Sequence, residues 1–465
     1  MTAAEPAAPV GVVGGGIAGL RAALVLHERG HRVVLFEASE RLGGVIRTER
    51  DAGFLLEGGP DSFLVQKPEG LALVRELGLA DRLVPTNPNA RAVFVLRGGR
   101  LLPTPEGMTL TVPTRVWPVL ASPLFSWRAK LRMGLDLVRP GRRDGGDESI
   151  ASFVRRRFGA EVLERLAEPL LAGIHAGDPE TLSLRATFPR LAALEEAHGS
   201  VVRGLRAAPP PAPGAFPSAF AALQGGLGEL VLALASRLPA AAVRTKCAVR
   251  ALRRDDQGFS LRLENGDPWA CRAVVVALPP PAAAPLVEPV STDAASLLSG
   301  IRFASTVVLV LGYRREDVGH ALDGYGLLVP RGEGLRTTAL SFHSTKLEGR
   351  VPEGHVMLRV FLGGIHDGGV VDLKDDELLE IARREMGPVL GLRGEPMLVR
   401  VFRWPHATPQ MEVGHLGRVA RIEQAIAAVP GLFLTGAGLR GTGLPDTIGD
   451  AQRTATAAAD FLTRA

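Results

Sequence analysis

The stretch "VGVVGGGIAGLRAAL" from Val10 to Leu24 joins an apolar run to a glycine-rich turn and then to a helical pattern. The apolar run is typical of a buried parallel strand. In the G-x-G-x-x-G turn that follows, Gly14 makes the tight bend, Gly16 lets the backbone approach a pyrophosphate and Gly19 lets the helix pack against the strand. The first N–H groups of that helix face the phosphate. The residues expected at the phosphate are Gly14, Gly15, Gly16, Ile17, Ala18 and Gly19.

A second apolar run, "HRVVLFE", ends in Glu37 and completes a β–α–β pattern. A carboxylate at this position can accept hydrogen bonds from both ribose hydroxyls of an adenosine, and it disfavours a 2′-phosphate. The alternative is a glycine turn that serves only strand–helix packing, but that reading leaves Glu37 unexplained. The pattern therefore predicts a dinucleotide other than NADP.

Composition limits the remaining classes of function. The chain has 465 residues, which favours two or three domains, and it is 46% hydrophobic and 22% charged, as in globular proteins. Aromatic residues make up 5%, and the basic residues behind the net charge of +5 are scattered, so we expect no nucleic-acid partner. The ten histidines form neither an HExxH nor an HxxxH set, so we expect no metal site.

The cysteines and the first ten residues indicate in which cellular compartment the protein is expected. Cys247 and Cys271 lie in separate apolar runs without CxxC spacing, and we interpret them as buried reduced thiols, with a disulfide as the alternative. The first ten residues lack the basic start of a signal peptide, and no apolar run approaches the roughly 18 residues that a membrane span needs. We expect a cytoplasmic protein, with peripheral contact to the inner face of the cell membrane left open.

The segment "ERLGGVIRTE" from Glu40 to Glu49 favours FAD over NAD as the dinucleotide. Its arginine and diglycine resemble the R-x-G-G run that follows the first β–α–β unit in the amine-oxidase-like superfamily of FAD flavoproteins. "LEGGPDSF" from Leu56 to Phe63 resembles the next FAD-contacting turn of that superfamily. The FAD contacts that the resemblance implies here are Arg41, Gly43, Gly44, Val45, Gly59, Pro60, Asp61 and Ser62.

A second glycine-rich turn follows the apolar run "GLFL" near the end of the chain. Because FAD is extended, the resemblance implies that the first turn holds its adenosine end while this loop closes over the pyrophosphate, ribitol and ring. A helix that begins near Pro445 would point its positive end at the reduced flavin. The contacts implied in the middle and C-terminal segments are Val249, Trp404, Gly436, Thr442, Gly443 and Leu444.

The resemblance implies an α/β fold with a discontinuous, Rossmann-like FAD-binding domain of the amine-oxidase and p-hydroxybenzoate-hydroxylase type. An α+β substrate domain, read as an antiparallel sheet with helices, and a helical membrane-associating insertion complete it. We expect FAD-binding segments at 1–85, 209–286 and 404–465, with a proline-rich linker at 209–220. Substrate segments are expected at 86–108 and 287–403, and the helical insertion at 109–208.

Four further stretches resemble the oxygen-dependent porphyrinogen oxidases of haem synthesis, the protoporphyrinogen oxidase family with its coproporphyrinogen III oxidase branch. They are "GIHAGDPETLSLRATFP", "GYGLLVP", "FRWPHATPQMEVGH" and "GTGLPDTI", and the match covers nearly the whole chain. Met411 departs from the tyrosine that many relatives carry. The resemblance implies a six-electron oxidation of protoporphyrinogen IX or coproporphyrinogen III, in which dioxygen reoxidises FAD and becomes hydrogen peroxide.

The same resemblance implies a pocket for the macrocycle and needs no catalytic side chain. Arg91 stands where the protoporphyrinogen branch places its carboxylate-binding arginine, which tilts the choice of substrate toward protoporphyrinogen; a solvated surface arginine is the alternative. Gly173, Leu328 and Leu347 match positions near the macrocycle, with ordinary core packing as the alternative.

Basic and large apolar residues alternate in "TRVWPVLASPLFSWRAKLRMGLDLVRPGRR", a pattern that suits an interfacial surface. In the family this region associates with the membrane, and an internal helix with a solvated basic face is the alternative. The residues that carry the pattern are Trp117, Leu120, Phe125, Trp127, Arg128, Lys130 and Arg132.

Two other classes of function remain open, and a homodimer is left open as well. An amine oxidase or carotenoid desaturase could use the same fold, but only Tyr313 and Tyr325 are available for an aromatic cage around an amine. A flavin-free escort protein like the GDP-dissociation inhibitors is the third class, and the second glycine turn argues against it.

Overall fold

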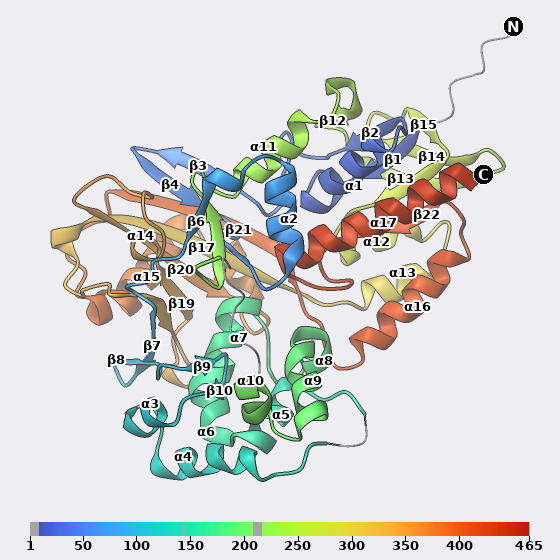
Figure 1. Ribbon diagram of the computed structural model, residues 1–465. Helices are drawn as coiled ribbons and strands as arrows, with labels where there is room; N and C mark the ends of the chain where they lie inside the picture. Colours follow the sequence, from blue (N-terminus) through green and yellow to red (C-terminus); the bar gives the residue numbers. More distant parts are fainter. Residues whose placement is uncertain (1–8, 143–144, 208–215, 465) are drawn as a thin grey trace, which may run out of the picture.

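The computed structural model describes residues 9–142, 145–207 and 216–464. Within these residues, Figure 1 shows a parallel sheet with helices near both chain ends, a larger second sheet, and a group of helices below it. The proline-rich linker expected at 209–220 lies mostly outside the described residues.

The first sheet is parallel throughout, and its five strands come from the N-terminal, middle and C-terminal parts of the chain. In spatial order they are β12 (Val243–Arg244), β2 (Val33–Phe36), β1 (Val10–Val13), β16 (Ala273–Val276) and β22 (Leu432–Leu434). Because parallel strands end at one edge of a sheet, the glycine turns after β1 and β22 lie at the same edge. This arrangement is the one that a single cofactor site with two glycine turns requires.

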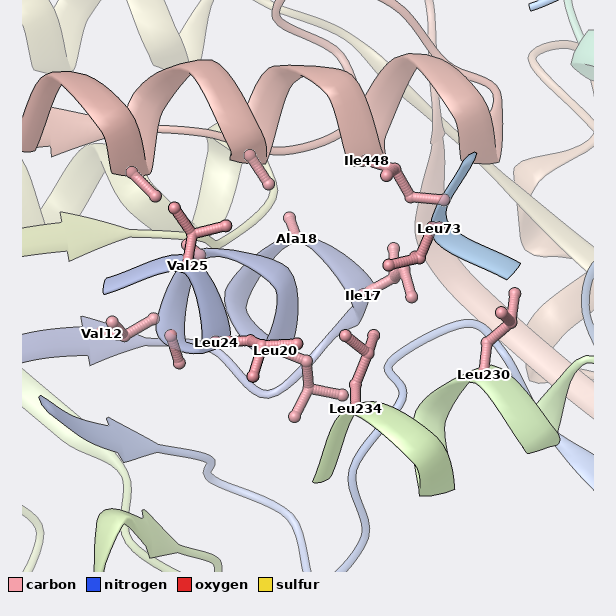
Figure 2. Packing of buried hydrophobic residues seen from close by; sticks show 14 of the residues in the cluster. Val12, Ile17, Ala18, Leu20, Leu24, Val25, Leu73, Leu230, Leu234 and Ile448 are labelled. Atoms are coloured by element: carbon pink, nitrogen blue, oxygen red, sulfur yellow. The ribbon is translucent and has the colours of Figure 1, made fainter. Parts of the chain in front are cut away.

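Helices cover one face of this sheet, and alternate strand residues such as Val10 and Val12 point into them. Figure 2 shows Leu20 and Leu24 above Leu234, and Ile448 beside Leu73. The helices are α1 (Ile17–Glu28), α2 (Pro68–Glu76), α11 (Gly228–Ser236) and α17 (Leu444–Arg464). Helix α11 follows a turn in which Gly226 has φ +91°.

The other face of the parallel sheet packs against a small antiparallel sheet and three helices. These are β13 (Val249–Asp255), β14 (Gly258–Leu263), β15 (Pro268–Cys271), α12 (Pro280–Val287), α13 (Thr292–Ser299) and α16 (His415–Ala427). Cys271 is buried in this layer, whereas Cys247 is only half-buried because it lies in the turn before β13. Both cysteines are free thiols, as expected, and the prediction of full burial is wrong for Cys247.

The second sheet has seven strands, and helix α15 (Asp375–Leu390) packs on one of its faces. In spatial order the strands are β21 (Leu398–Pro409), β17 (Phe303–Arg314), β20 (His355–Gly363), β19 (Thr337–Phe342), β18 (Gly324–Leu328), β7 (Ala92–Arg97) and β8 (Arg100–Pro103). Neighbours are antiparallel except β18 and β7, which pair in parallel. The purely antiparallel expectation fails there because the two strands come from distant segments that no hairpin joins. Helix α14 (His343–Lys346) follows β19.

Two two-stranded sheets and one three-stranded sheet complete the strands of the described residues. They are β3 (Thr48–Asp51) with β4 (Phe54–Glu57), β11 (Phe220–Leu223) with β5 (Phe63–Leu64) and β6 (Leu83–Pro85), and β9 (Met108–Thr109) with β10 (Val112–Pro113).

The third group of elements is the helical insertion, which shares one apolar core with β7, β18 and β19. Its helices are α3 (Val116–Ala121), α4 (Trp127–Gly134), α5 (Ile150–Arg157), α6 (Ala160–Val162), α7 (Glu168–His175), α8 (Leu184–Thr187), α9 (Pro189–His198) and α10 (Val201–Ala207). Among residues 9–142, 145–207 and 216–464, none of the helices has the length and apolar character of a membrane span.

The insertion exposes a different apolar surface from the one expected. Trp117 and Trp127 are exposed, but Phe125 is buried in the helical core and Leu120 is half-buried. Leu131 and Val138, at 73% and 78% exposure, take their places. The insertion patch is therefore Val116, Trp117, Trp127, Leu131, Leu135 and Val138.

A buried ion cluster holds the insertion together around Glu195. Its carboxylate accepts hydrogen bonds from Arg156 Nη1 at 2.6 Å and Arg157 Nε at 2.9 Å, and Arg157 also lies 3.2 Å from Asp136. Burial alone raises the pKa of Glu195, but the hydrogen bonds from the two arginines outweigh it and lower the pKa to about 2. Since the folded pKa lies below the ordinary value of about 4.3, the ionised carboxylate stabilises the fold above that pH.

We therefore expect Glu195→Gln to destabilise the protein by about 3 kcal/mol near neutral pH, because the buried Arg157 and the half-buried Arg156 each lose one of their counter-charges. The gap in urea midpoint between this variant and the wild type should narrow as pH falls from 5 toward 2. Urea unfolding followed by circular dichroism at several pH values measures this difference in midpoint. A gap that stays constant over this range would contradict the assignment.

Candidate cofactor and substrate site

The turn between β1 and α1 brings backbone against backbone. A Cβ atom on Gly19 would lie 1.8 Å from the carbonyl oxygen of Gly14, and one on Gly14, at φ +110°, would lie 2.6 Å from the carbonyl oxygen of Ala277. Gly16 is different, since the nearest atom to its Cβ position is Gly44 Cα at 4.0 Å. Gly14 and Gly19 thus serve the fold, and Gly16 faces open space.

The start of helix α1 is left without a protein partner that could act as an anion. Its N-cap is Gly16, no side chain caps it, and its first turn, which includes Ile17 and Ala18, contains no acidic residue. An uncapped helix N-terminus carries free N–H groups and a partial positive charge. This end of the helix suits a phosphate group.

Glu37 is held in place at the end of β2. Its Oε2 accepts from the Gly15 N–H at 2.7 Å, and its Oε1 accepts from the Ser39 N–H at 2.8 Å. Each oxygen keeps acceptor capacity for a ribose hydroxyl. Cys247 N–H donates to the Glu37 carbonyl at 2.9 Å, so the segment that leads to the half-buried Val249 runs alongside.

The second turn lies directly on the first. Gly43 N–H donates to the Gly15 carbonyl at 2.8 Å, and the Arg41 guanidinium donates to the carbonyls of Gly44 at 2.6 Å and Ile46 at 3.1 Å. Arg41 therefore shapes this turn from within. The next residue, Val45, is 41% exposed, which is unusual for an apolar side chain beside a buried sheet.

The third turn follows β4 and closes on the second. A Cβ atom on Gly59 would lie 1.8 Å from the carbonyl oxygen of Val45, so the two turns touch through their backbones. Pro60 follows and is half-buried. Trp404 of β21 donates its Nε1–H to the Gly58 carbonyl at 2.7 Å, which brings this tryptophan from the second sheet to the turn.

Asp61 in this turn is bound by the second sheet as well. Its carboxylate accepts from Lys346 Nζ at 2.8 and 2.9 Å, from Arg359 Nη1 at 2.8 Å and from the Ser62 hydroxyl at 2.7 Å. Burial raises its pKa, but the charges of Lys346 and Arg359 outweigh that effect and hold the pKa well below its usual range. With these bonds made, Asp61 acts on the shape of the turn and has little capacity left for a ligand.

Sequence reasoning missed Lys346 and Arg359. A signal was available for Arg359, since it interrupts the apolar strand "HVMLRVFLGG" and is only 2% exposed. A charged residue is almost never fully buried unless it is paired, so an arginine inside an apolar strand calls for a partner.

The C-terminal loop supplies the fourth part of the site. Gly436, at φ +131°, donates its N–H to Asp450 at 3.2 Å, and a Cβ atom there would meet only the Leu278 carbonyl oxygen at 3.7 Å. Thr442, Gly443 and Leu444 are half-buried, next to the start of α17.

The positive end of α17 carries a counter-charge. Asp446 in its first turn accepts from the Gly443 N–H at 3.3 Å and pairs with Lys67 Nζ at 2.5 Å. Because Lys67 balances this carboxylate, the pair adds no net charge to the positive end of the helix.

The residues expected at the macrocycle fall into two groups. A Cβ atom on Gly173 of α7 would lie 3.2 Å from Ala339 Cβ and 3.4 Å from Leu328 Cδ2, so Gly173 and Leu328 form one wall between the insertion and the second sheet. Leu347 has no exposed surface, which favours its core interpretation. Arg91 is exposed just before β7, with no ion pair in the described part of the chain. The buried Met411 binds the Ser183 N–H through its carbonyl at 2.8 Å.

These features fit a long, anionic dinucleotide. The uncapped helix end suits its phosphates, Glu37 suits a ribose, and Gly16, Gly44 and Gly436 leave the backbone open to a close approach. No cluster of three potential metal ligands occurs in the described residues.

Two glycine variants separate the cofactor surface from the fold. We expect Gly16→Ala to leave the apoprotein folded, because its Cβ meets no protein atom closer than 4.0 Å, but to weaken binding of a dinucleotide at this edge at least about tenfold. Gly19→Ala should instead lower thermal stability, because its Cβ collides with the Gly14 carbonyl. Calorimetric titration with FAD and melting curves measure the two effects, and equal FAD affinity for Gly16→Ala and wild type would refute the assignment.

Comparison with known proteins supports this architecture over the whole chain. The family model described as flavin containing amine oxidoreductase matches residues 17–460. A coproporphyrinogen III oxidase of Bacillus subtilis is 34% identical, with 97% of this chain and 98% of that protein aligned. A chloroplastic protoporphyrinogen oxidase of Oryza sativa subsp. japonica is 33% identical over 97% of this chain and 88% of that protein.

A crystal structure of an Exiguobacterium protein superposes with a TM-score of 0.87 at 29% identity, covering 97% of this chain and 98% of that one. Sequence and fold thus agree from the first glycine turn to the last helix. The chain belongs to the flavin-containing amine oxidoreductase family and, within it, to the group of the porphyrinogen oxidases.

Proposed function

We propose that the chain is an FAD-dependent porphyrinogen oxidase of haem biosynthesis, which converts protoporphyrinogen IX to protoporphyrin IX or coproporphyrinogen III to coproporphyrin III. The observation that carries the proposal is the match to coproporphyrinogen III oxidase over 97% of the chain, helical insertion included. When bound, FAD supplies a two-electron acceptor that dioxygen can reoxidise, so three cycles remove six electrons and release three molecules of hydrogen peroxide.

The residues of the chain then have the tasks of binding and exclusion. The four turns hold the cofactor along the edge of the parallel sheet, and Trp404 stands beside the third turn. The wall of Gly173 and Leu328 offers an apolar surface to the macrocycle. Arg91 is free to pair with a propionate carboxylate. Pyrrole N–H protons can leave to solvent, so no side-chain base is required.

We propose the same division into domains as the sequence suggests, with cofactor segments at 1–85, 209–286 and 404–465, substrate segments at 86–108 and 287–403, and the insertion at 109–208. The parallel sheet, which draws its strands from all three cofactor segments, supports this division.

The alternatives receive less support. For an amine oxidase, Tyr313 is 1% exposed in the core of the second sheet, and the Tyr325 hydroxyl donates to Thr86 Oγ1 at 2.8 Å, so neither is free to cage an amine. A flavin-free escort protein would not need the space beside Gly16 and Gly436 or the uncapped start of α1, which a dinucleotide would fill.

The test is to mix the purified, FAD-loaded protein with each porphyrinogen separately, in air and in the dark, and to follow porphyrin fluorescence. Acceleration over a protein-free control is expected with at least one substrate, with hydrogen peroxide released at about three per porphyrin. Acceleration with neither, from protein that holds FAD, would overturn the substrate and leave the fold intact.

Arg91→Ala should raise KM about tenfold or more with little change in kcat, because a charge-assisted bond is worth about 1.5–3 kcal/mol. Arg100→Ala, an exposed arginine on the neighbouring strand β8, is the matched control and should leave both constants unchanged. If the two variants have the same KM, Arg91 does not bind the substrate and is an ordinary surface residue.

We also propose that the insertion patch contacts a membrane surface. Six of the thirteen large hydrophobic residues that are exposed in the described chain lie in this patch, and Trp117 is 80% exposed. Arg128 is exposed between them, and the Lys130 ammonium lies 4.5 Å from the Trp127 ring centroid. Aromatic rings beside cations suit the headgroup region of an anionic bilayer.

Co-sedimentation with anionic liposomes tests the patch. We expect wild type in the pellet at low salt and the double variant Trp117→Ser/Leu131→Ser in the supernatant. Leu232→Ser, which removes a 71% exposed leucine on α11, is the control and should still sediment. Wild type wholly in the supernatant at both low and high salt would exclude membrane contact of this kind.

A further inference from the structure

A buried group of charges lies behind the third cofactor turn. It consists of Asp61, His343, Lys346 and Arg359, hereafter the Asp61 cluster, in which His343 Nδ1 lies 3.3 Å from Asp61 Oδ2. Asp61, His343 and Arg359 are 7%, 0% and 2% exposed, and the side chain of Lys346 is 16% exposed. Three of its four members come from the second sheet and α14, and only Asp61 belongs to the cofactor turn.

The charges in the Asp61 cluster do not cancel. Lys346 and Arg359 contribute two positive charges against one negative charge on Asp61. Burial lowers the pKa of His343 to about 4, and neither ring nitrogen has a hydrogen-bond partner among the described residues, so the imidazole is neutral. The cluster therefore has a net charge of about +1.

The surrounding groups do not supply the missing negative charge. Arg350, 1% exposed, donates to the carbonyls of Leu223 at 2.7 Å and Gln224 at 3.4 Å and adds a further cation. Glu57 is the other acid near the cluster, and burial raises its pKa to about 7, so it is only about half ionised at neutral pH and does not outweigh the charge that Arg350 adds. An excess buried charge costs several kcal/mol unless an opposite charge is brought to it.

The excess charge lies against the third turn of the proposed cofactor site. Arg359 Nη2 donates to the Gly59 carbonyl at 2.5 Å, in the turn that also receives the Trp404 Nε1–H. The start of α17 is a second source of positive potential in this region, because its Asp446 is already paired with Lys67. Among the groups of the second sheet and α14, the cluster is the uncompensated positive charge that contacts the third turn.

A flavin acquires the complementary charge during its work. Two-electron reduction with uptake of one proton leaves the ring system with one negative charge, whereas the oxidised ring is neutral. A fixed positive charge nearby stabilises the reduced form more than the oxidised form, because it costs no reorganisation at the moment of reaction.

We propose that Lys346 and Arg359, with their charge only partly balanced by Asp61, are electrostatic positioning residues that raise the reduction potential of the bound flavin. The inference rests on the proposed FAD binding and adds a role for residues outside the cofactor turns. The cluster also fixes the turn itself, so the experiment must separate charge from shape.

Opposite charge changes achieve that separation. Lys346→Met makes the cluster neutral and should lower the midpoint potential of the FAD-loaded protein, measured by spectroelectrochemistry. Asp61→Asn makes it more positive and should raise the potential. A tenfold change in the ratio of affinities for reduced and oxidised flavin corresponds to about 30 mV for a two-electron couple, and we expect shifts of at least this size.

Controls use conservative and remote variants. Lys346→Arg and Asp61→Glu keep the charges and should keep the wild-type potential. Lys374→Met, at an exposed lysine before α15, should also leave it unchanged. If Lys346→Met does not retain FAD, the difference between Asp61→Asn and Asp61→Glu decides the matter.

The results distinguish this inference from the proposed function. Potentials that shift in the same direction in Lys346→Met and Asp61→Asn, or that do not shift, would mean that the cluster only clamps the turn. Failure of the wild-type protein to bind FAD would instead refute the proposed function itself, before any variant is compared.

Discussion

The close contact of backbones without side chains is the constraint on which the site depends. Gly19 approaches the Gly14 carbonyl so closely that a Cβ would lie 1.8 Å from it, and Gly59 meets the Val45 carbonyl in the same way. Between these contacts, the Gly43 N–H reaches the Gly15 carbonyl at 2.8 Å. Three turns from different parts of the N-terminal segment can stack at the sheet edge only because glycine leaves the space empty. The same lack of side chains opens the surface to a dinucleotide.

The third turn belongs to both halves of the molecule. Trp404 and Arg359 of the second sheet bind the carbonyls of Gly58 and Gly59, and Lys346 binds Asp61. The cofactor surface is therefore complete only when the second sheet is docked, even though the turn itself follows β4. The chain passes several times between the parallel sheet and the second sheet. As a result, residues of the second sheet and α14 contact the third turn directly.

The local parts of this arrangement could be predicted from sequence, and the long-range parts could not. Apolar runs and glycine spacing identify β1, α1 and the turn between them, because those signals are contained within a few residues. Pairing of β18 with β7 in parallel, or of Asp61 with Lys346 across 285 positions, leaves no local trace. Burial on a helix is also a long-range property. Phe125 packs into the insertion while Leu131 is exposed, and the alternation of apolar and basic residues did not distinguish them.

The helical insertion is an integral part of the substrate side. One apolar core contains the inner faces of α3 and α4, the middle of α7, and Leu328 and Ala339 of the second sheet. The outer faces of α3 and α4 carry the insertion patch. Interiors are close-packed and transmit displacement, so the patch and the wall at Gly173 cannot move independently. A surface that holds the patch would therefore also restrict the wall that borders the proposed macrocycle site, because both belong to this one core.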